Sequence, residues 1–267
     1  AKVAFKHDGT VDIFVGTQSN GQGHETTFAQ FLADQTGVPY DVINVIQGDS
    51  DQIVMGGGTG GSRSATVQNN ATLVTVGTMI EAFTEYLADK FQVIENDIHF
   101  DDETFRIAGS NLTPSMLDCA EMARLDGRQD LLTHEATAEL QARSFPNGAH
   151  VAEVEVDPET GFVRVERYTV VDDFGNLFNP MLVEGQVHGG VAQGIGQAIN
   201  EHVVYDQNGQ LLTATFMDYG MPRAKDVPLM FFETEPILST ANPMGVKGCG
   251  EAGTVGALAA VANAVQD

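Results

Sequence analysis

Three glycine-rich segments, each followed by a stretch with helical spacing, constrain this chain more than any other feature. They lie at residues 21–23, 56–61 and 245–250, in a chain that has 29 glycines among 267 residues. Glycine lets a ligand approach the backbone closely and provides the positive φ angles that aim successive N–H groups at an anion. A glycine-rich turn that leads into a helix is therefore a candidate anion site, although three ordinary turns before helices would look the same.

None of the three segments matches a common nucleotide-binding or hydrolase motif. No Gly-Lys-Ser/Thr occurs, which excludes a Walker A loop. Residues 248–253 read Gly-Cys-Gly-Glu-Ala-Gly, but no clear strand precedes them and only 14 residues follow Gly253, too few for the rest of a Rossmann unit. The Gly-x-Ser-x-Gly elbow of serine hydrolases is also absent.

Hydrophobic periodicity predicts strands and helices along the chain. Alternating apolar residues predict two hairpins, one from residues 2–6 and 10–15 and the other from residues 151–156 and 162–172. Helical spacing predicts helices over residues 26–36, 65–91, 181–199 and 251–265, with one or two surface helices within residues 112–140. Further strands are expected at residues 40–47, 201–205, 211–215 and 230–235, and an acidic hairpin within residues 94–106. Ser62 and Ser64 are candidates to cap the long helix.

The two halves of the chain share an order of elements, which predicts a duplicated unit. Each half has a hairpin, a loop with glycine, a helix, a strand and a further helix. Each also places a Gly-Gln-x-His sequence near its first helix, at residues 21–24 and 185–188. Pro146 and Gly148 mark the boundary. We therefore predict an α+β fold of two repeated units of mixed β-sheet covered by helices, residues 1–145 and 146–267.

The charge and cysteine content exclude several classes of protein. Thirteen Lys and Arg residues against 37 Asp and Glu give a net charge of −24, which repels nucleic acids and anionic membranes, so neither is an expected partner. Two cysteines, Cys119 and Cys249, are too few for a disulfide framework, a four-cysteine zinc site or a thiolate-bound iron–sulfur cluster. No apolar run is long enough to cross a bilayer and no signal peptide is recognised, so a cytoplasmic location is expected.

Polar side chains near the glycines are the candidates for ligand binding. The amides of Gln22 and Gln186 can read the edge of a heterocycle. The guanidinium of Arg63, between Ser62 and Ser64, suits a phosphate. Each has an ordinary alternative, which is a loop hydrogen bond for the glutamines and a surface ion pair for Arg63 in this acidic chain.

Glu251 has the most informative position of any single residue. It stands where the last loop meets the last helix, between Gly250 and Ala252, with little side-chain bulk beside it. It is either an exposed general base or an acid that stabilises the helix dipole, and the residues alone leave both roles open. A base would need burial to raise its pKa, because a helix N-terminus lowers it. His24 and His188 are likewise open between ligand binding and packing near a helix start.

At these residues the sequence resembles the molybdenum-binding subunit of the xanthine oxidase family, the molybdenum hydroxylases. The matching stretches occur in the family's order, at residues 21–27 (Gly-Gln-Gly-His-Glu-Thr-Thr), 58–64 (Gly-Thr-Gly-Gly-Ser-Arg-Ser), 184–186 (Glu-Gly-Gln) and 245–253 (Gly-Val-Lys-Gly-Cys-Gly-Glu-Ala-Gly). They look closer to the carbon monoxide dehydrogenase branch than to animal xanthine dehydrogenases. The resemblance extends over nearly the whole chain but only to the C-terminal half of that subunit, which implies a fragment or one part of a split subunit, inactive alone.

The resemblance implies a cofactor and a chemistry. Molybdenum on a molybdopterin, usually the cytosine dinucleotide form in bacterial relatives, would oxidise an aldehyde, an N-heterocycle or carbon monoxide with oxygen from water. Glu251 would take the proton from the Mo–OH group. The cofactor would be bound, with no protein side chain ligating the metal, by Gly21, Gln22, Gly23, His24, Gly60, Gly61, Ser62, Arg63, Ser64, Gln186, Gly248 and Gly250.

The resemblance also implies partners. The 2Fe-2S clusters and the FAD would belong to an iron–sulfur subunit and a flavin subunit, and the remaining N-terminal half of the molybdenum subunit would be a third partner. A second interpretation makes the chain a non-catalytic domain that binds a nucleotide or another subunit, in which Glu251 only caps a helix. The substrate stays open, because the loop that would distinguish substrates lies in the half of the subunit that this sequence does not match.

Overall fold

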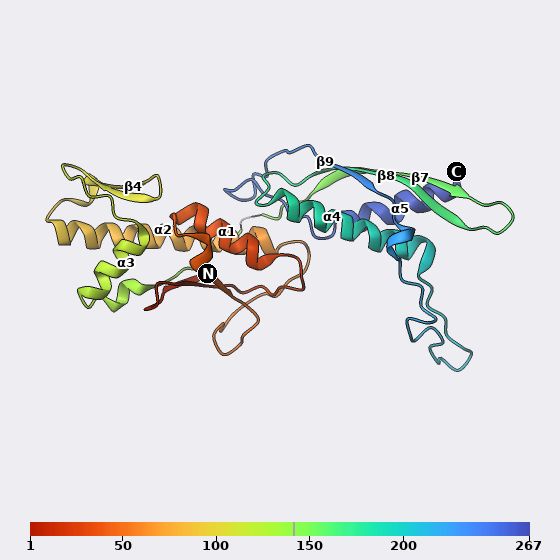
Figure 1. The fold of residues 1–267 in the computed structure, drawn as a ribbon, viewed down its shortest axis with the longest axis horizontal. Helices are drawn as coiled ribbons and strands as arrows, with labels where there is room; N and C mark the ends of the chain where they lie inside the picture. The colour runs from red at the N-terminus through yellow and green to blue at the C-terminus, as the bar shows by residue number, and fades with distance from the viewer. Residues whose placement is uncertain (141) are drawn as a thin grey trace. The chain divides into compact units, whose positions relative to one another are not determined.

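A computed structural model describes residues 1–140 and 142–267 and divides the chain into two compact units (Figure 1). The first unit comprises residues 1–143 with residues 241–243, and the second comprises residues 144–240 and 244–267. Each unit has its own cluster of buried apolar side chains. The chain passes from the first unit to the second between Arg143 and Ser144.

The first unit is built on a four-stranded mixed sheet. Its strands are β1 (Lys2–Phe5), β2 (Val11–Phe14), β3 (Ile43–Ile46) and β6 (Thr133–Glu135), in the order β3-β2-β1-β6. The β1–β2 hairpin is antiparallel, whereas β3 lies parallel to β2. Helix α1 (His24–Thr36) makes the crossover that a parallel pair requires.

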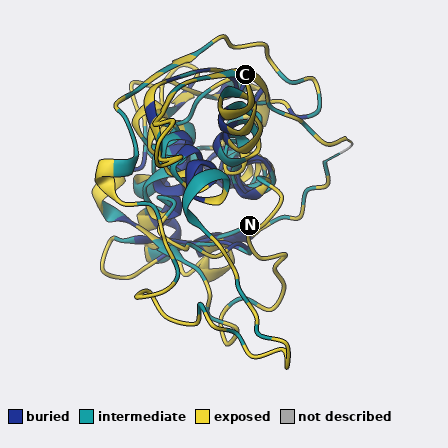
Figure 2. Cartoon of the chain, turned by 90° about the vertical axis from the view of Figure 1, so that its right-hand side faces the viewer, coloured by how far each residue is buried: buried dark blue, intermediate teal, exposed yellow. Residues whose placement is uncertain are grey.

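Two further helices and a small hairpin complete the first unit. They are α2 (Ser64–Phe91), α3 (Met116–Leu125), β4 (Ile98–Asp101) and β5 (Thr104–Ile107). Phe28 of α1, Phe83 of α2 and Phe105 of β5 are fully buried in the shared core, with Val3 and Ile13 from the sheet. The buried side chains of this unit therefore lie between its sheet and its helices. Figure 2, coloured by burial, shows that the long loops of the chain are largely exposed.

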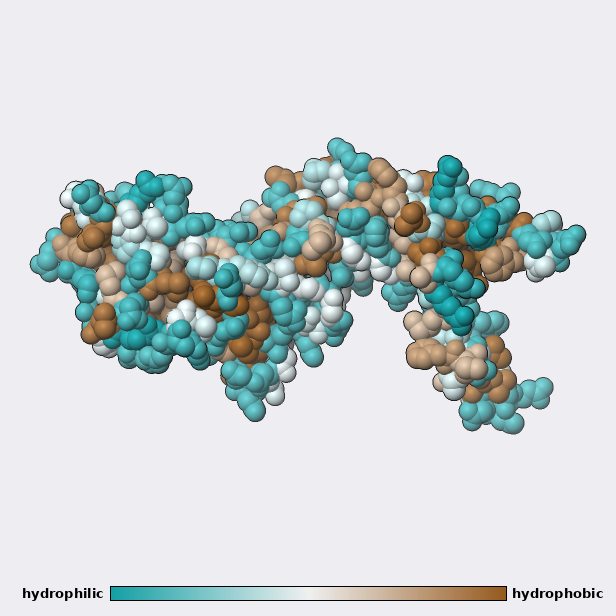
Figure 3. Space-filling view, in the orientation of Figure 1, coloured by the Kyte–Doolittle hydropathy of each residue, from teal (hydrophilic) through white to brown (hydrophobic). Residues whose placement is uncertain are grey.

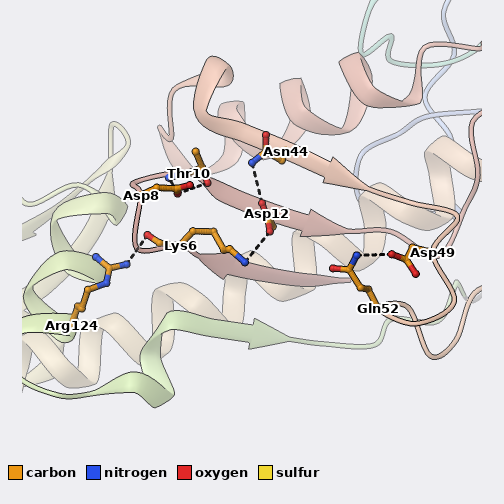
Figure 4. A network of polar contacts seen from close by, with 8 residues as sticks. All are labelled: Lys6, Asp8, Thr10, Asp12, Asn44, Asp49, Gln52 and Arg124. Carbon is orange, nitrogen blue, oxygen red and sulfur yellow. Dashed lines mark hydrogen bonds and ion pairs between the residues drawn. The ribbon is translucent and has the colours of Figure 1, made fainter.

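Polar contacts fasten the edge of the first sheet (Figure 4). Asp12 of β2 accepts a hydrogen bond of 3.0 Å from Asn44 Nδ2 of β3 and lies 3.4 Å from the ammonium of Lys6. Arg124, in α3, donates to the carbonyl of Lys6 at 2.8 Å. These contacts hold β2 and β3 in parallel register, with Asp12 opposite Asn44. The C-terminal ends of these two strands lead into the first two glycine-rich loops.

The second unit is a three-stranded sheet with two helices packed on it. The strands are β7 (Asn147–Val156), β8 (Val163–Asp173) and β9 (Met230–Thr234), and the helices are α4 (Pro180–Ile195) and α5 (Ala252–Gln266). Val170, Val191 and Val261 are fully buried between the sheet and the helices. A long excursion from residue 201 to residue 229 exposes apolar side chains, including Phe216 at 80% and Met217 at 92% of their surface (Figures 1 and 3).

Both sheets have the same pairing pattern. In each, an antiparallel hairpin is followed by a helix and then by a strand parallel to the second strand of the hairpin. A long helix, α2 or α5, comes later in each unit. The α+β architecture with mixed sheets is therefore as the sequence indicates. That the units are repeats of one another stays a prediction, which this shared pairing supports.

Two expectations from the sequence are wrong, the strands within residues 201–215 and the serine cap of α2. Residues 201–215 form no strands beyond a single bridge between Tyr205 and Leu211, because no neighbouring strand pairs with them. Residues 112–140 contain one helix, α3, in agreement with the one or two expected there, and also strand β6, which the sequence does not predict and which pairs with β1. Neither Ser62 nor Ser64 caps α2, since its N-cap residue is Arg63. Among the described residues, no helix combines the length and the apolar character needed to cross a bilayer.

Candidate functional site

The first two glycine-rich loops are bonded to each other in the first unit. The amide of Gly58 donates to the carbonyl of Gly16 at 3.1 Å. Thr59 Oγ1 donates to the carbonyl of Gln18 at 2.6 Å and accepts from the Gln18 amide at 3.1 Å. A Cβ on Gly56 would lie 2.5 Å from the Gly16 oxygen, so only glycine permits this approach. The two loops, at the ends of β2 and β3, therefore form one structure.

The second loop bends sharply before it enters α2. Gly58 and Gly61 have φ angles of 63° and Ser62 has 53°, all in the left-handed region. Ser64 is already helical, and its hydroxyl donates to Thr59 Oγ1 at 3.2 Å instead of capping the helix. Arg63 is the N-cap residue and makes no side-chain capping bond. The first N–H groups of a 28-residue helix therefore lack a side-chain cap, which is a favourable setting for an anion.

Arg63 is a cation with no acidic neighbour. Within the described part of the chain, no carboxylate lies within ion-pair distance of its guanidinium, although the chain carries a net charge of −24. The guanidinium instead lies against the backbone of Gly57, where a Cβ would collide with it. The surface ion pair that was the alternative role for Arg63 is therefore not what the structure has. Gly60 and Gly61 beside it are exposed and have open space around them.

Gln22 turns back onto its own loop. Its Oε1 accepts from the amide of Asn20, and its Nε2 donates to the carbonyl of Gln18 at 3.4 Å. These are the loop hydrogen bonds that the sequence left as its alternative role. Gly21 and Gly23 flank it with φ angles of 98° and 80°, and Gly23 is the N-cap residue of α1. The loop geometry therefore depends on both glycines.

His24 begins α1 as a buried side chain. It is 6% exposed, and its ring lies 4.8 Å from that of Phe28. Burial lowers the pKa of His24, and the negative charge of Glu25 opposes that effect only in part, so the imidazole is neutral at pH 7. Glu25 accepts from Ser19 Oγ at 3.2 Å and from Gln47 Nε2 at 2.6 Å. His24 thus packs at the helix start while Glu25 joins the first loop to the end of β3.

Several buried polar atoms in the first unit have no hydrogen-bond partner among the described residues. They are Thr17 Oγ1, His24 Nδ1, Gln47 Oε1, both side-chain atoms of Asn69 and Arg124 Nε. A buried polar atom without a partner costs about 1–3 kcal/mol, so ordered water, a ligand or another polypeptide would stabilise these positions by adding a partner. His24 and Gln47 also lie close enough for a side-chain hydrogen bond between them to act on the pKa of His24. The sequence motifs do not include Thr17 or Gln47. Their positions could have indicated a role in binding. Each residue follows one of two parallel strands, at the edge where such sheets bind ligands.

The third glycine-rich loop is fastened to the end of β8 in the second unit. Gly245 has a φ of 69°, and its carbonyl accepts from the amide of Asn176 at 3.2 Å. The amide of Lys247 donates to the carbonyl of Phe174 at 2.8 Å. The ammonium of Lys247 forms a buried ion pair with Asp173. The loop therefore leads into α5 from a fixed start.

Glu251 is the N-cap residue of α5. It is exposed, with φ −108° and ψ −9°, and its side chain makes no capping hydrogen bond. Of the two glycines beside it, Gly248 is buried and Gly250 is exposed. Glu251 thus occupies the N-cap position that the capping interpretation requires. Its side chain does not make the capping hydrogen bond. Its charge would still favour the helix dipole.

Gln186 lies inside α4, within the helix that the sequence predicts over residues 181–199, so it makes no loop hydrogen bond of the kind considered for it. It is half-buried and precedes Val187, whose carbonyl lies so close to Gly253 of α5 that a Cβ there would collide with it. Because Gly253 is two residues after Glu251, the structure brings Gln186 and Glu251 to the same end of the α4–α5 pair. The first two loops belong to the other unit.

Both cysteines are packed thiols. Cys119 is buried in the first core, and burial raises its pKa well above the ordinary value. Cys249, between Gly248 and Gly250, is half-buried, and burial raises its pKa to about 11. Each is therefore a neutral thiol at pH 7. Within residues 1–140 and 142–267, no three His, Cys, Asp or Glu side chains are placed to hold a metal ion.

Comparison with known proteins identifies the family. Residues 1–228 match the model of the molybdopterin cofactor-binding domain. The chain belongs to this family of cofactor-binding domains, which forms part of the large subunits of xanthine oxidase-type enzymes. The resemblance that the glycine-rich motifs indicated is thus confirmed.

The relatives are subunits of molybdopterin-dependent oxidoreductases. All of this chain aligns with 34% of the nicotine 6-hydroxylase large subunit of Paenarthrobacter nicotinovorans, at 37% identity. It likewise aligns with 34% of the carbon monoxide dehydrogenase large chain of Afipia carboxidovorans, at 33% identity. A crystal structure of Cu,Mo-CO dehydrogenase superposes with a TM-score of 0.91 at 32% identity, over 100% of this chain and 34% of that one. The chain thus spans about a third of the length of these relatives.

Proposed function

We propose that this chain is the molybdopterin-binding part of a molybdenum hydroxylase that oxidises an aldehyde, an N-heterocycle or carbon monoxide with oxygen derived from water. The observation that carries the proposal is the position of Glu251, which begins α5 within the Gly-Cys-Gly-Glu-Ala-Gly sequence. Its carboxylate is exposed in this chain, so the burial that a base requires would come from the bound cofactor and the rest of the subunit. Family membership supports the choice of cofactor. All three expected substrate classes stay open, because no described residue distinguishes them.

The described residues fit an anionic pterin dinucleotide. Arg63 offers a cation that no carboxylate of the described residues pairs with, beside the uncapped start of α2. The left-handed turn at residues 61–62 adds backbone amides. The orphaned atoms of Thr17, His24 and Gln47 offer polar partners. We assign the pyrophosphate to Gly60, Gly61, Ser62, Arg63 and Ser64, and the pterin and metal-ligand contacts to Gly21, Gln22, Gly23, His24, Gln186, Gly248 and Gly250. The cytosine dinucleotide form belongs to this proposal.

When bound, the molybdenum cofactor supplies a Lewis acid and a two-electron acceptor for oxygen transfer. Glu251 then acts as a general base, and its carboxylate accepts the proton of the water-derived nucleophile. Gln186, at the same end of the helix pair, orients the pterin through its amide. The buried Lys247–Asp173 ion pair fixes the loop before Glu251, so the carboxylate is held in place rather than free to move.

The partners follow from the cofactor chemistry. Electrons leave through 2Fe-2S clusters and FAD, which we assign to an iron–sulfur subunit and a flavin subunit. The remainder of the large subunit is the third partner, and its length in the relatives supports this, since they are about three times as long as this chain. The exposed apolar side chains of residues 201–229 are available for such a partner.

The test is Glu251→Gln in the assembled enzyme, which removes the basic oxygen but keeps the shape. We expect turnover to fall by about 10²–10⁴-fold while molybdenum content is unchanged, because general-base catalysis contributes that much. Glu159→Gln, in the exposed β7–β8 turn, is the matched control and should leave turnover unchanged. Retained turnover in Glu251→Gln would favour the non-catalytic interpretation, and absence of molybdenum by elemental analysis would exclude the cofactor altogether.

A further inference from the structure

A buried polar cluster lies under the helix that Glu251 begins. His150 of β7 lies between Tyr168 and Asp172 of β8. Its Nδ1 is 2.9 Å from the Tyr168 hydroxyl, and its Nε2 is 3.3 Å from Asp172 Oδ1. The His150 and Asp172 side chains are 7% and 3% exposed, and Tyr168 is 1% exposed. None of the three belongs to the proposed cofactor-binding set.

The register of the sheet creates this cluster. His150 pairs with Val170, so Tyr168 and Asp172, two residues to either side, project on the same face of the sheet. The carboxylate favours a proton on His150 Nε2, which leaves Nδ1 to accept from the Tyr168 hydroxyl. Burial and the charge of Asp172 raise the pKa of Tyr168, so that hydroxyl keeps its proton. Both ring nitrogens of His150 thus have a partner on β8.

Glycines make room for the cluster on both sides. Gly148 lies opposite Asp172 in the sheet, and a Cβ there would collide with the carboxylate. Gly256 of α5 lies over the imidazole, and a Cβ there would be 2.5 Å from two atoms of the His150 ring. Gly256 does not have a positive φ. The His150 ring therefore touches the backbone of α5 directly, five residues after Glu251.

The same strand end also reaches the loop before Glu251. Asp173, next to Asp172, pairs with Lys247 of that loop. The charge of Asp172 adds to the effect of burial on the pKa of Cys249, so that carboxylate lies near the loop as well. Two adjacent carboxylates thus act on the two segments that flank Glu251. Asp173 holds the loop, and Asp172 holds the imidazole on which α5 rests.

We propose that His150, held by Asp172 and Tyr168, is a positioning residue that fixes where α5 begins and thereby where the Glu251 carboxylate lies. This inference rests on the proposed function of Glu251. Asp172 Oδ2 is buried and has no hydrogen-bond partner among the described residues, a cost that a purely structural role leaves unexplained. Fixing the imidazole under the first turns of α5 would account for keeping this buried carboxylate. Small displacements of a base such as Glu251 lower the rate steeply.

The test compares Asp172→Asn with Glu166→Gln in the assembled enzyme. Both exchange a carboxylate for its amide on β8, but Glu166 is exposed. We expect Asp172→Asn to lower kcat per bound molybdenum by about 10–100-fold with KM changed less than about threefold, because it misplaces the base without touching the substrate. Tyr168→Phe should act in the same direction and decides the matter if Asp172→Asn does not assemble.

A second measurement does not depend on turnover. Hydrogen exchange of the amides at residues 252–256 should become faster in Asp172→Asn and stay unchanged in Glu166→Gln. A kcat per molybdenum within about twofold of the parent, a rise in KM alone, or unchanged exchange would each overturn the proposal. The parallel Glu251→Gln enzyme separates the two claims. If Glu251→Gln keeps its turnover, the proposed function is wrong. If Glu251→Gln loses turnover but the cluster variants keep theirs, only the role of His150 is wrong.

Discussion

Two helices in this chain begin with charged residues of opposite sign. Glu251 at the start of α5 has the charge that a helix N-terminus favours, whereas Arg63 at the start of α2 has the charge that it disfavours. Neither side chain makes a capping hydrogen bond. Arg63 has no carboxylate partner among the described residues and lies beside uncapped amides in an acidic protein, a setting that a bound anion would stabilise.

Arg63→Gln therefore has opposite expected effects in the two states of the protein. Without cofactor it should leave stability unchanged or raise it by up to about 1 kcal/mol, because an unfavourable charge leaves the helix N-terminus. With cofactor it should weaken binding about 10–100-fold, the value of one or two charge-assisted hydrogen bonds. Thermal unfolding measures the first effect, and molybdopterin content after dialysis measures the second.

Arg106→Gln is the matched control, because it removes the same charge from an exposed pair with Asp101 and Asp102 in the same unit. It should change neither the cofactor content nor, by more than about 1 kcal/mol, the stability. Equal cofactor loss in the two variants would mean that net charge, rather than the position of Arg63, governs binding.

At the scale of elements, glycines determine how closely α4 and α5 pack. A Cβ on Gly190 would lie 2.9 Å from the amide nitrogen of Thr254 and 3.0 Å from Gly253 Cα. Thr254 Oγ1 in turn donates to the carbonyl of Gly190 at 3.1 Å. Neither helix can yield there without moving its backbone. The contact therefore fixes the position of the first residues of α5, and with them Glu251, along the axis of α4.

Gly190→Ala and Gly189→Ala form a matched pair on adjacent residues of α4. Gly190→Ala should destabilise the protein by about 1–3 kcal/mol, because the added methyl group overlaps the backbone of α5. Gly189 has open space around it, so Gly189→Ala should stabilise the helix by about 0.5–1 kcal/mol. Chemical unfolding measures both. Two changes of the same sign would contradict the close helix contact.

The elements that the sequence predicts well are those with a local signal. Residues 65–91 and 251–265 have helical spacing over several turns and are helices within a residue or two. Strand β6 has three residues and exists because β1, more than a hundred positions earlier, pairs with it. Residues 201–215 alternate but have no partner strand. The local hydrophobic pattern carries no information about which strands pair when they are far apart in the sequence.

The candidate site divides in the same way. Arg63 and Glu251 follow from motifs that are continuous in the sequence. The orphaned atoms of Thr17 and Gln47 appear only when β2 and β3 lie side by side. The His150 cluster requires the register of β7 and β8, which is shifted by an irregularity at Glu153 and Val154 that no pattern predicts. Motifs therefore identify ligand-binding residues better than the residues that hold them.

For the whole molecule, the buried ionisable groups set the pH range of stability. Burial lowers the pKa of His24 and His134, so the folded state keeps both neutral. Below about pH 6.5 the unfolded chain takes up protons that the fold excludes, and stability falls. Burial raises the pKa of Cys249 to about 11. Above about pH 8.5 the unfolded thiol ionises first, so stability falls again.

Asp173 adds a separate contribution at lower pH. Burial alone would raise its pKa, but Lys247 and the amides of Ile237 and Gly175 lower it overall. A carboxylate with a lowered folded pKa stabilises the fold above its unfolded pKa of about 3.9, and that stability is lost as the pH falls through the folded value. The Asp173–Lys247 ion pair is therefore expected to lose its contribution to stability only below about pH 4. The two histidines begin to lower the stability at about pH 6.5.

Asp173→Asn tests this separation. At pH 7 it should cost about 3–5 kcal/mol, because Lys247 is left buried without its partner. From pH 6.5 to 4 its stability should decline in parallel with that of the parent, since the histidines are unchanged. Below about pH 4 the parent should lose up to about 1.4 kcal/mol per pH unit more than the variant, the slope for one proton. Urea unfolding across this range gives both curves, with the exposed Asp34→Asn as the control that follows the parent throughout. Parallel curves below pH 4 would mean that Asp173 and Lys247 do not hold the loop through their charges, and the fixed position of Glu251 would then need another cause.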